Sequence, residues 1–175
     1  MAISIRLTIG DEGQLASDIF SQLIARVENT ARNSATIVAI RLADELNLPS
    51  AVIQLLAIRI STHPDSLFWI SEIHAGSKII TGALLASALI TTVLNNTIGE
   101  SLKEGWRHTE THKMISASVP QIEKMVISEF KRLFDRQKGM PLGSDLEVDP
   151  VAILRDEKTS IIKITARQLR SKPRF

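Results

Sequence analysis

Apolar and polar residues alternate strictly near both ends of the chain. Residues 3–9 read ISIRLTI, and residues 160–168 read SIIKITARQ. A period of two places every second side chain on the same face, which is typical of a β-strand with one buried and one polar face. We therefore expect a first strand at residues 3–9 and a last strand at residues 160–168.

Three stretches between these strands have a helical period instead. Apolar residues recur at steps of three and four over residues 15–27, over 35–46 and over 118–138, which predicts amphipathic helices. The polar residues 29–33 separate the first two stretches, so these form either two helices or one long helix with a polar joint. Asn47 lies two residues before Pro49, and that proline predicts the end of the helix.

Two shorter segments complete the expected fold. Residues 51–60, AVIQLLAIRI, are rich in β-branched side chains and favour a buried strand, with a helix as the alternative. Residues 67–75 predict a second strand that forms a hairpin with 51–60, and residues 139–158 predict a loop. The resulting β-α-β-β-α-β order indicates an α+β fold with a small mixed or antiparallel sheet, in which the first and last strands lie side by side.

The longest uncharged run extends from Ile79 to Gly99, between Lys78 and Glu100. We expect it to form one long apolar helix, either across a membrane or at the centre of a protein core. Small residues within it suit close helix packing, although Asn95 and Asn96 interrupt a simple span. The side chains expected to mediate membrane insertion or oligomer contacts are Ile79, Gly82, Leu84, Leu85, Ala86, Leu89, Ile90, Val93 and Leu94.

The composition of the chain is typical of a globular protein. The chain has 175 residues, 44% of them hydrophobic and 23% charged, so we expect a single domain over 1–175 with a basic tail at 169–175. The absence of cysteine excludes disulfides and cysteine-ligated metals. The first ten residues show no basic segment followed by an apolar one, so we expect no secretory leader and a location at the bacterial inner membrane or in the cytoplasm. A net charge of +2 makes nucleic acid an unlikely partner.

Few residues form a pattern typical of a metal-binding, DNA-binding or catalytic site. His108 and His112 are four residues apart and share a face if the segment is helical, which is a weak metal-site pattern. Glu110 falls on the opposite side and does not complete it. Residues 42–59 resemble a helix-turn-helix in length, but the second half offers only Ser50, Gln54 and Arg59 among apolar residues, too few to read DNA. We expect no catalytic residues, no cofactor and no enzymatic activity.

Two local patterns resemble parts of a known group of proteins. They are Glu72-Ile-His-Ala-Gly-Ser77 and the segment Thr97 to Trp106 with the following Thr109-Glu-Thr-His112. Together they resemble small, mostly uncharacterised bacterial α+β proteins with a hydrophobic segment, some of them associated with conflict or anti-phage systems. The resemblance covers about a quarter of the chain. It implies a membrane-directed module and assigns no site residue.

Two hypotheses of function follow. The first is a non-enzymatic, self-associating bacterial effector or adaptor that contacts a membrane through residues 79–99. The second is a soluble oligomeric interaction or scaffold domain in which residues 79–99 are the core helix. Both hypotheses predict a homo-oligomer, and a further protein partner fits either of them.

Overall fold

The computed structural model describes residues 2–10, 17–74, 79–102, 119–136, 146–148, 151–155 and 159–168. In chain order the elements are β1 Ala2–Gly10, α1 Ser17–Glu45, α2 Ser50–Ser61, β2 Phe68–His74, β3 Ile79–Leu84, α3 Ala86–Leu102, α5 Val119–Arg136, β4 Leu146–Val148, β5 Ala152–Arg155 and β6 Thr159–Gln168. The expected α+β class is confirmed. The predicted tail at 169–175 lies outside the described residues.

The chain groups into two compact units. One comprises Met1–Asn29, Phe68–Leu84 and Lys131–Phe175, and the other comprises Thr30–Leu67 and Leu85–Phe130. The sheet belongs to the first unit, and α2 and α3 belong to the second. Helices α1 and α5 contribute residues to both.

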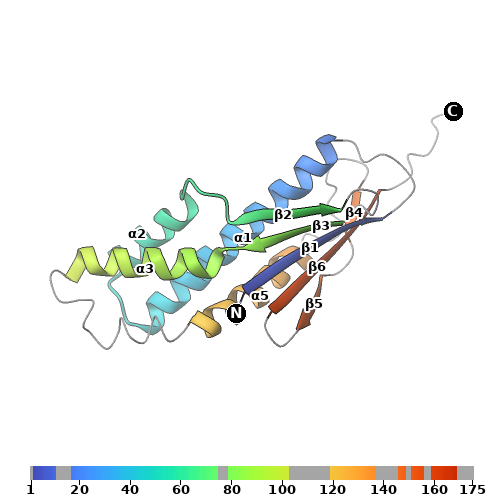
Figure 1. Cartoon of the computed structure of the whole chain (residues 1–175). Coiled ribbons are helices and arrows are strands. Elements are labelled where there is room, and N and C mark those ends of the chain that lie inside the picture. The colour runs from blue at the N-terminus through green and yellow to red at the C-terminus, as the bar shows by residue number, and fades with distance from the viewer. Residues whose placement is uncertain are drawn as a thin grey trace. The chain divides into compact units, whose positions relative to one another are not determined.

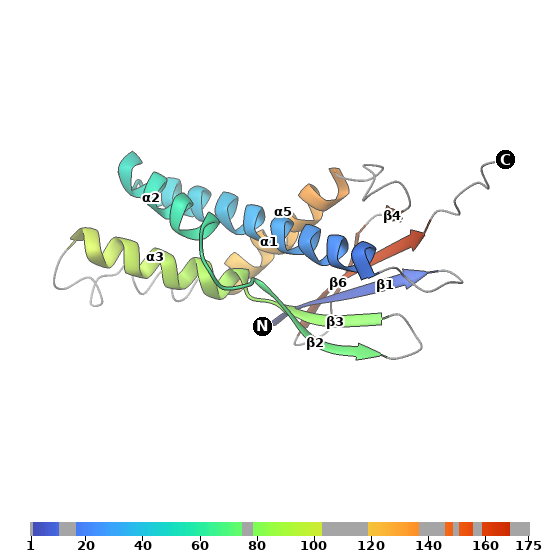
Figure 2. The same ribbon diagram turned by 90° about the horizontal axis from the view of Figure 1, so that it is seen from above.

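The sheet is mixed, with the strand order β2-β3-β1-β6-β4, and β5 also pairs with β6 (Figures 1 and 2). Strands β1 and β6 are parallel neighbours, with Ile5 opposite Ile162. The expectation that the first and last strands lie side by side is therefore confirmed. On the other side of β1, strand β3 runs antiparallel and places Gly82 opposite Ile5.

One face of the sheet is buried, as the alternating sequence predicts. Cross-strand neighbours share a face, and the register aligns the buried side chains of β1, β3 and β6. These inward-facing residues are Ile3, Ile5, Leu7, Ile80, Leu84, Ile162, Ile164 and Ala166. The residues between them, such as Arg6 and Lys163, are only partly buried.

The expected single helix at 79–99 is wrong. Ile79–Leu84 is strand β3, which pairs with β1 on one side and β2 on the other. Only from Ala86 does the run become helical, as α3. The outer-face residues of β3 (Ile79, Thr81 and Ala83) carry no charge, so the strand reads as part of one uncharged run that periodicity does not separate from a buried helix. None of the helices in the described ranges has the length and apolar character that a membrane span requires.

The expected strand at 51–60 is also wrong, because this segment is helix α2. Pro49 occupies the N-cap position with extended backbone angles, which suits entry into a helix. Leu56 and Ile60, four residues apart, are its buried side chains, so the helical alternative holds. The expected hairpin partner is different too: β2 pairs with β3 and not with residues 51–60.

Helix α1 is one continuous helix of 29 residues. The polar residues 29–33 therefore do not divide it into two helices. Within it Thr30 and Ser34 are buried, and the Ser34 hydroxyl donates a hydrogen bond of 2.6 Å to the Thr30 carbonyl oxygen. Bonds of this kind let a hydroxyl side chain lie inside a helix. Asn47 follows the helix with a left-handed φ of 52°, and the chain then reaches Pro49 as expected.

The C-terminal segment contains more structure than predicted. The amphipathic helix expected at 118–138 is confirmed as α5. The loop expected at 139–158 instead includes the short strands β4 and β5, and both pair with β6. In the first unit Asp135, near the end of α5, accepts a hydrogen bond of 2.9 Å from the Val151 backbone N–H. Strands β4 and β5, with three and four residues, are too short to show a period of two in the sequence.

Candidate interaction surface

Helices α2 and α3 lie beside one another in the second unit (Figures 1 and 2). Arg59 joins them. Its guanidinium donates hydrogen bonds to the Thr97 hydroxyl at 3.2 Å and to the Glu100 carboxylate at 2.6 Å. The only charged residue of α2 is therefore turned toward α3 and neutralised there.

A shallow groove of about 300 Å³ lies between the two helices. Arg59 and Glu100 form its charged part, and the remaining lining residues are Thr62, His63, Pro64, Thr92, Val93 and Asn96. Because the cation and the anion of this groove bind each other, they give a small ligand little net charge to recognise.

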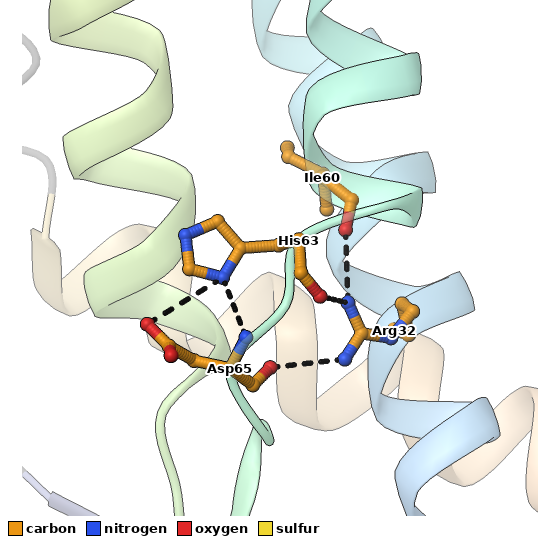
Figure 3. Close-up of polar contacts among 4 residues, drawn as sticks. All are labelled: Arg32, Ile60, His63 and Asp65. Carbon is orange, nitrogen blue, oxygen red and sulfur yellow. Dashed lines mark hydrogen bonds and ion pairs between the residues drawn. The ribbon is translucent and has the colours of Figure 1, made fainter.

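The C-terminal end of α2 is held by Arg32 of α1 (Figure 3). One guanidinium nitrogen donates to the carbonyl oxygens of Ile60 at 3.3 Å and His63 at 2.7 Å. The other donates to the carbonyl oxygen of Asp65 at 3.0 Å. Only the Ile60 carbonyl belongs to α2, so Arg32 ties the last turn of the helix to the turn that follows it. The His63 ring accepts the Asp65 backbone N–H at 3.3 Å and completes the turn.

The outward face of α2 is uncharged and includes two large apolar side chains. Leu55 is 39% exposed and Ile58 is 57% exposed. The exposed positions from the start of α2 to its C-cap are Ser50, Ala51, Gln54, Leu55, Ile58, Ser61 and Thr62. A surface helix ordinarily carries charged residues on the side away from the core. We call Ala51, Leu55, Ile58 and Thr62, at steps of four, three and four, the outward stripe of α2.

Further exposed apolar side chains lie on β2, at one edge of the sheet in the first unit, and they are divided between its two faces, since Trp69 is opposite Ala83 and Ile73 is opposite the buried Ile80. Trp69 is 60% exposed and Ile73 is 63% exposed, and Ile70 is exposed to a smaller extent. The register of β2 on β3 shifts between Ile70 and Glu72, so the strand contains a bulge at Ser71. Bulges and charged residues on an edge strand hinder the addition of a further strand, and β2 has both.

The nine side chains predicted to mediate membrane or oligomer contacts do not form one surface. Ile79, Gly82 and Leu84 are in β3, and Leu84 is buried. Leu85 is exposed, between the strand and the helix. The remaining five are buried, at the start of α3 or along it: Ala86, Leu89, Ile90, Val93 and Leu94.

The weak metal pattern of His108 and His112 lies outside the described residues. Within the ranges that the structure describes, no group of three or more His, Asp or Glu side chains is arranged to hold a metal ion.

Helix α5 places two acidic side chains in the interior of the second unit. Glu129 is buried, and one of its carboxylate oxygens is 3.8 Å from the Arg41 guanidinium. Glu123 is also buried, and this burial raises the pKa of its carboxyl group above the ordinary value of 4.5.

Sequence reasoning missed the outward stripe of α2 because it took residues 51–60 for a strand. The signal lies in the composition, because Ser50, Gln54 and Arg59 are the only polar residues of 50–59. On a helix, this composition leaves an apolar face that the helix's own domain does not cover.

Comparison with known proteins gives no relative from which a function could be transferred. No protein-family model, curated protein or solved structure matches the chain.

Proposed function

We propose that this protein is a non-enzymatic binding module, an effector or adaptor, that associates with copies of itself. In this proposal the residues of the Ile79–Gly99 run stabilise the fold, and the contacts with partners are made by apolar side chains elsewhere. The observation that supports it is the uncharged outward face of α2, where Leu55 and Ile58 are exposed.

Exposed apolar area costs free energy in proportion to its size, and Leu55 and Ile58 expose such area on α2 with no charged residue among the exposed positions of the helix. The centres of protein interfaces are depleted in charged residues in the same way. A nucleic-acid partner fits poorly, because phosphate binding needs exposed Lys or Arg side chains and the exposed positions of α2 have none.

The test is sedimentation velocity of the full chain in detergent-free buffer, from about 1 µM to about 1 mM, the range in which small interfaces dissociate. The proposal predicts that the weight-average sedimentation coefficient increases with concentration and returns on dilution. A single monomeric species over the whole range would contradict it.

A second candidate, peripheral contact with a membrane, is favoured by a different observation. Trp69 on β2 is 60% exposed, and Trp side chains favour the interface between lipid and water. If β2 contacts lipid, liposomes shift the emission of the wild-type protein to shorter wavelength, and the shift is lost in Trp69→Phe, which leaves Trp106 as the remaining tryptophan. The same shift in both proteins, or in neither, would contradict this candidate.

A further inference from the structure

We infer that the open face of the sheet binds an extended acidic segment of a partner protein. We call it the outer face: it carries the side chains of β1, β3 and β6 that alternate with the buried ones, and each of these whose burial the structure describes is partly exposed. The sheet belongs to the first unit. The inference therefore goes beyond the proposed self-association through α2 and does not depend on it.

Two cations lie side by side at the centre of the outer face. Arg6 of β1 is directly opposite Lys163 of β6 in the parallel register, and neighbouring strands are about 4.8 Å apart. Like charges that face each other across two strands are destabilising. Among the residues that the structure describes, neither side chain has an ion pair or a hydrogen bond. A partner that carries carboxylates would neutralise this pair.

The sheet supplies one carboxylate in the same cross-strand row, that of Glu72 on β2. Glu72 is opposite Thr81 of β3, and Thr81 is opposite Arg6. A whole strand therefore separates Glu72 from Arg6, and two strands separate it from Lys163. The acidic side chain is at the edge of the sheet, and the centre of the outer face remains basic.

The surroundings of the two cations favour a protein over a nucleic acid. Trp69 is 60% exposed at one end of the outer face, and Leu154 is 45% exposed at the other. They are opposite Ala83 and Ile161 respectively, in the cross-strand row next to that of Arg6. Trp and Arg are enriched among the side chains that dominate binding at protein interfaces. Affinity for a nucleic acid comes from many phosphate contacts, whereas the centre of this face offers two cations.

The spacing of these groups fits a segment that crosses the strands. The order β2-β3-β1-β6, continued by β5, makes the row from Trp69 to Leu154 about 19 Å wide. An extended chain presents alternate side chains on one side at intervals of about 6.7 Å, so about seven residues present four side chains over this width. Apolar side chains at the two ends and carboxylates at the two central positions would match Trp69, the two cations and Leu154 in order.

A synthetic peptide with this pattern tests the inference. The probe is acetyl-Leu-Ser-Glu-Ser-Glu-Ser-Leu-amide, titrated into the isotope-labelled full chain and followed by NMR, which detects weak binding. A second peptide has lysine in place of both glutamates. Arg6→Gln and Lys163→Gln each remove one cation from the outer face. Arg155→Gln is the matched control, because Arg155 is exposed on β5 but is opposite the buried Ser160, on the other side of the strand from Leu154.

We expect the acidic peptide to bind at low salt with a Kd of about 1 mM or lower, to shift the amide signals of β1 and β6, and to bind more weakly as salt is added. Arg6→Gln and Lys163→Gln should each raise the Kd by about two- to fivefold, and Arg155→Gln should leave it unchanged. Both outer-face variants should melt at or above the wild-type temperature, since each removes a contact between like charges.

The inference is overturned if the acidic peptide does not bind, if the lysine peptide binds equally well, or if Arg155→Gln weakens binding as much as Arg6→Gln does. Tighter binding of an oligothymidylate of similar length, weakened by the same variants, would assign the outer face to a nucleic acid instead. A markedly lower melting temperature of Arg6→Gln and Lys163→Gln would contradict the argument from repulsion. Each of these outcomes leaves the sedimentation test of self-association unaffected.

Discussion

At the scale of single residues, Gly82 shows how tightly β2 and β3 are packed. A Cβ atom at this position would contact the Phe68 ring and would be 2.5 Å from the Trp69 carbonyl oxygen. Phe68 is itself buried, so its ring has little room to move away. The absence of a side chain at residue 82 is therefore a packing requirement of the sheet.

Gly82→Ala should lower the free energy of unfolding by about 3 kcal/mol, because it inserts a methyl group into occupied space. Urea denaturation followed by circular dichroism measures the effect. Ala83→Ser, at the next position of the same strand and on its other face, is the control and should change stability little. Equal stability of Gly82→Ala and the wild-type protein would show that β2 and β3 are not paired in this register.

Arg32 joins the last turn of α2 to the following turn through three backbone carbonyl oxygens. Arg32→Met keeps most of the apolar stem and removes the donors, so we expect a loss of about 1–3 kcal/mol of stability. Arg32→Lys retains the charge but not the planar set of donors, and it should recover only part of that loss. Thermal unfolding of the wild-type protein, Arg32→Met and Arg32→Lys ranks their stabilities. Wild-type stability of Arg32→Lys would mean that a positive charge alone is sufficient at this position.

At the scale of elements, β2 is an edge strand with both apolar residues and protective features. The bulge at Ser71 and the charge of Glu72 oppose pairing with another strand, while Trp69 and Ile73 are exposed. Glu72→Val removes the charge and increases β propensity, so we expect faster aggregation at elevated temperature, followed by light scattering. Glu45→Val, the same change at an exposed position of α1, is the control, and equal rates for both variants would contradict this role of Glu72.

The buried carboxyl group of Glu123 in α5 makes stability depend on pH. Its pKa is raised by burial, so the folded state binds this proton more tightly than the unfolded state does. The contribution is most favourable below the unfolded value of 4.5 and is lost as the pH rises through the raised pKa. Glu123→Gln cannot ionise, and it should therefore be more stable than the wild-type protein at pH 7.5.

The stability difference between Glu123→Gln and the wild-type protein should shrink as the pH falls toward about 4. Urea titrations at several pH values measure it, and Lys124→Gln, at the exposed neighbouring position, controls for a changed surface charge. A difference that stayed constant with pH, or a destabilised glutamine variant at pH 7.5, would contradict this account of Glu123.

The elements differ in how well the sequence predicts them, for physical reasons. Strands β1 and β6 each have one buried face, so their alternation is visible, and α5 has a clear helical stripe. The Ile79–Gly99 run has no such contrast, because the outer-face residues of β3 (Ile79, Thr81 and Ala83) are uncharged and α3 is largely buried. No Gly, Pro or Asn lies at residues 84–86, where the strand gives way to the helix, so no local signal predicts that boundary.

The candidate surface was less predictable than the fold. Identifying the outward stripe requires knowing that residues 50–61 are a helix and that Leu56 and Ile60 point inward. Only then does the composition of the remaining positions become informative. The sequence shows that residues 50–61 contain few charges, but only the structure shows which of these positions are exposed.

At the scale of the whole molecule, the central claim is that the chain associates with itself through the outward face of α2. Ile58 is the most exposed large apolar residue of this helix. In a symmetric dimer both copies carry the Ile58→Glu substitution, so two carboxylates enter one apolar contact. Burying an unpaired charge is strongly unfavourable, while an exposed glutamate on a monomer costs little.

The most direct measurement compares the sedimentation of the wild-type protein, Ile58→Glu and Ala88→Glu over the same concentrations. Ala88 is exposed on α3, so its variant adds the same charge outside the outward stripe. We predict reversible association of the wild-type protein and Ala88→Glu, and an Ile58→Glu protein that remains folded by circular dichroism and stays monomeric. Association of Ile58→Glu with unchanged affinity would contradict the claim.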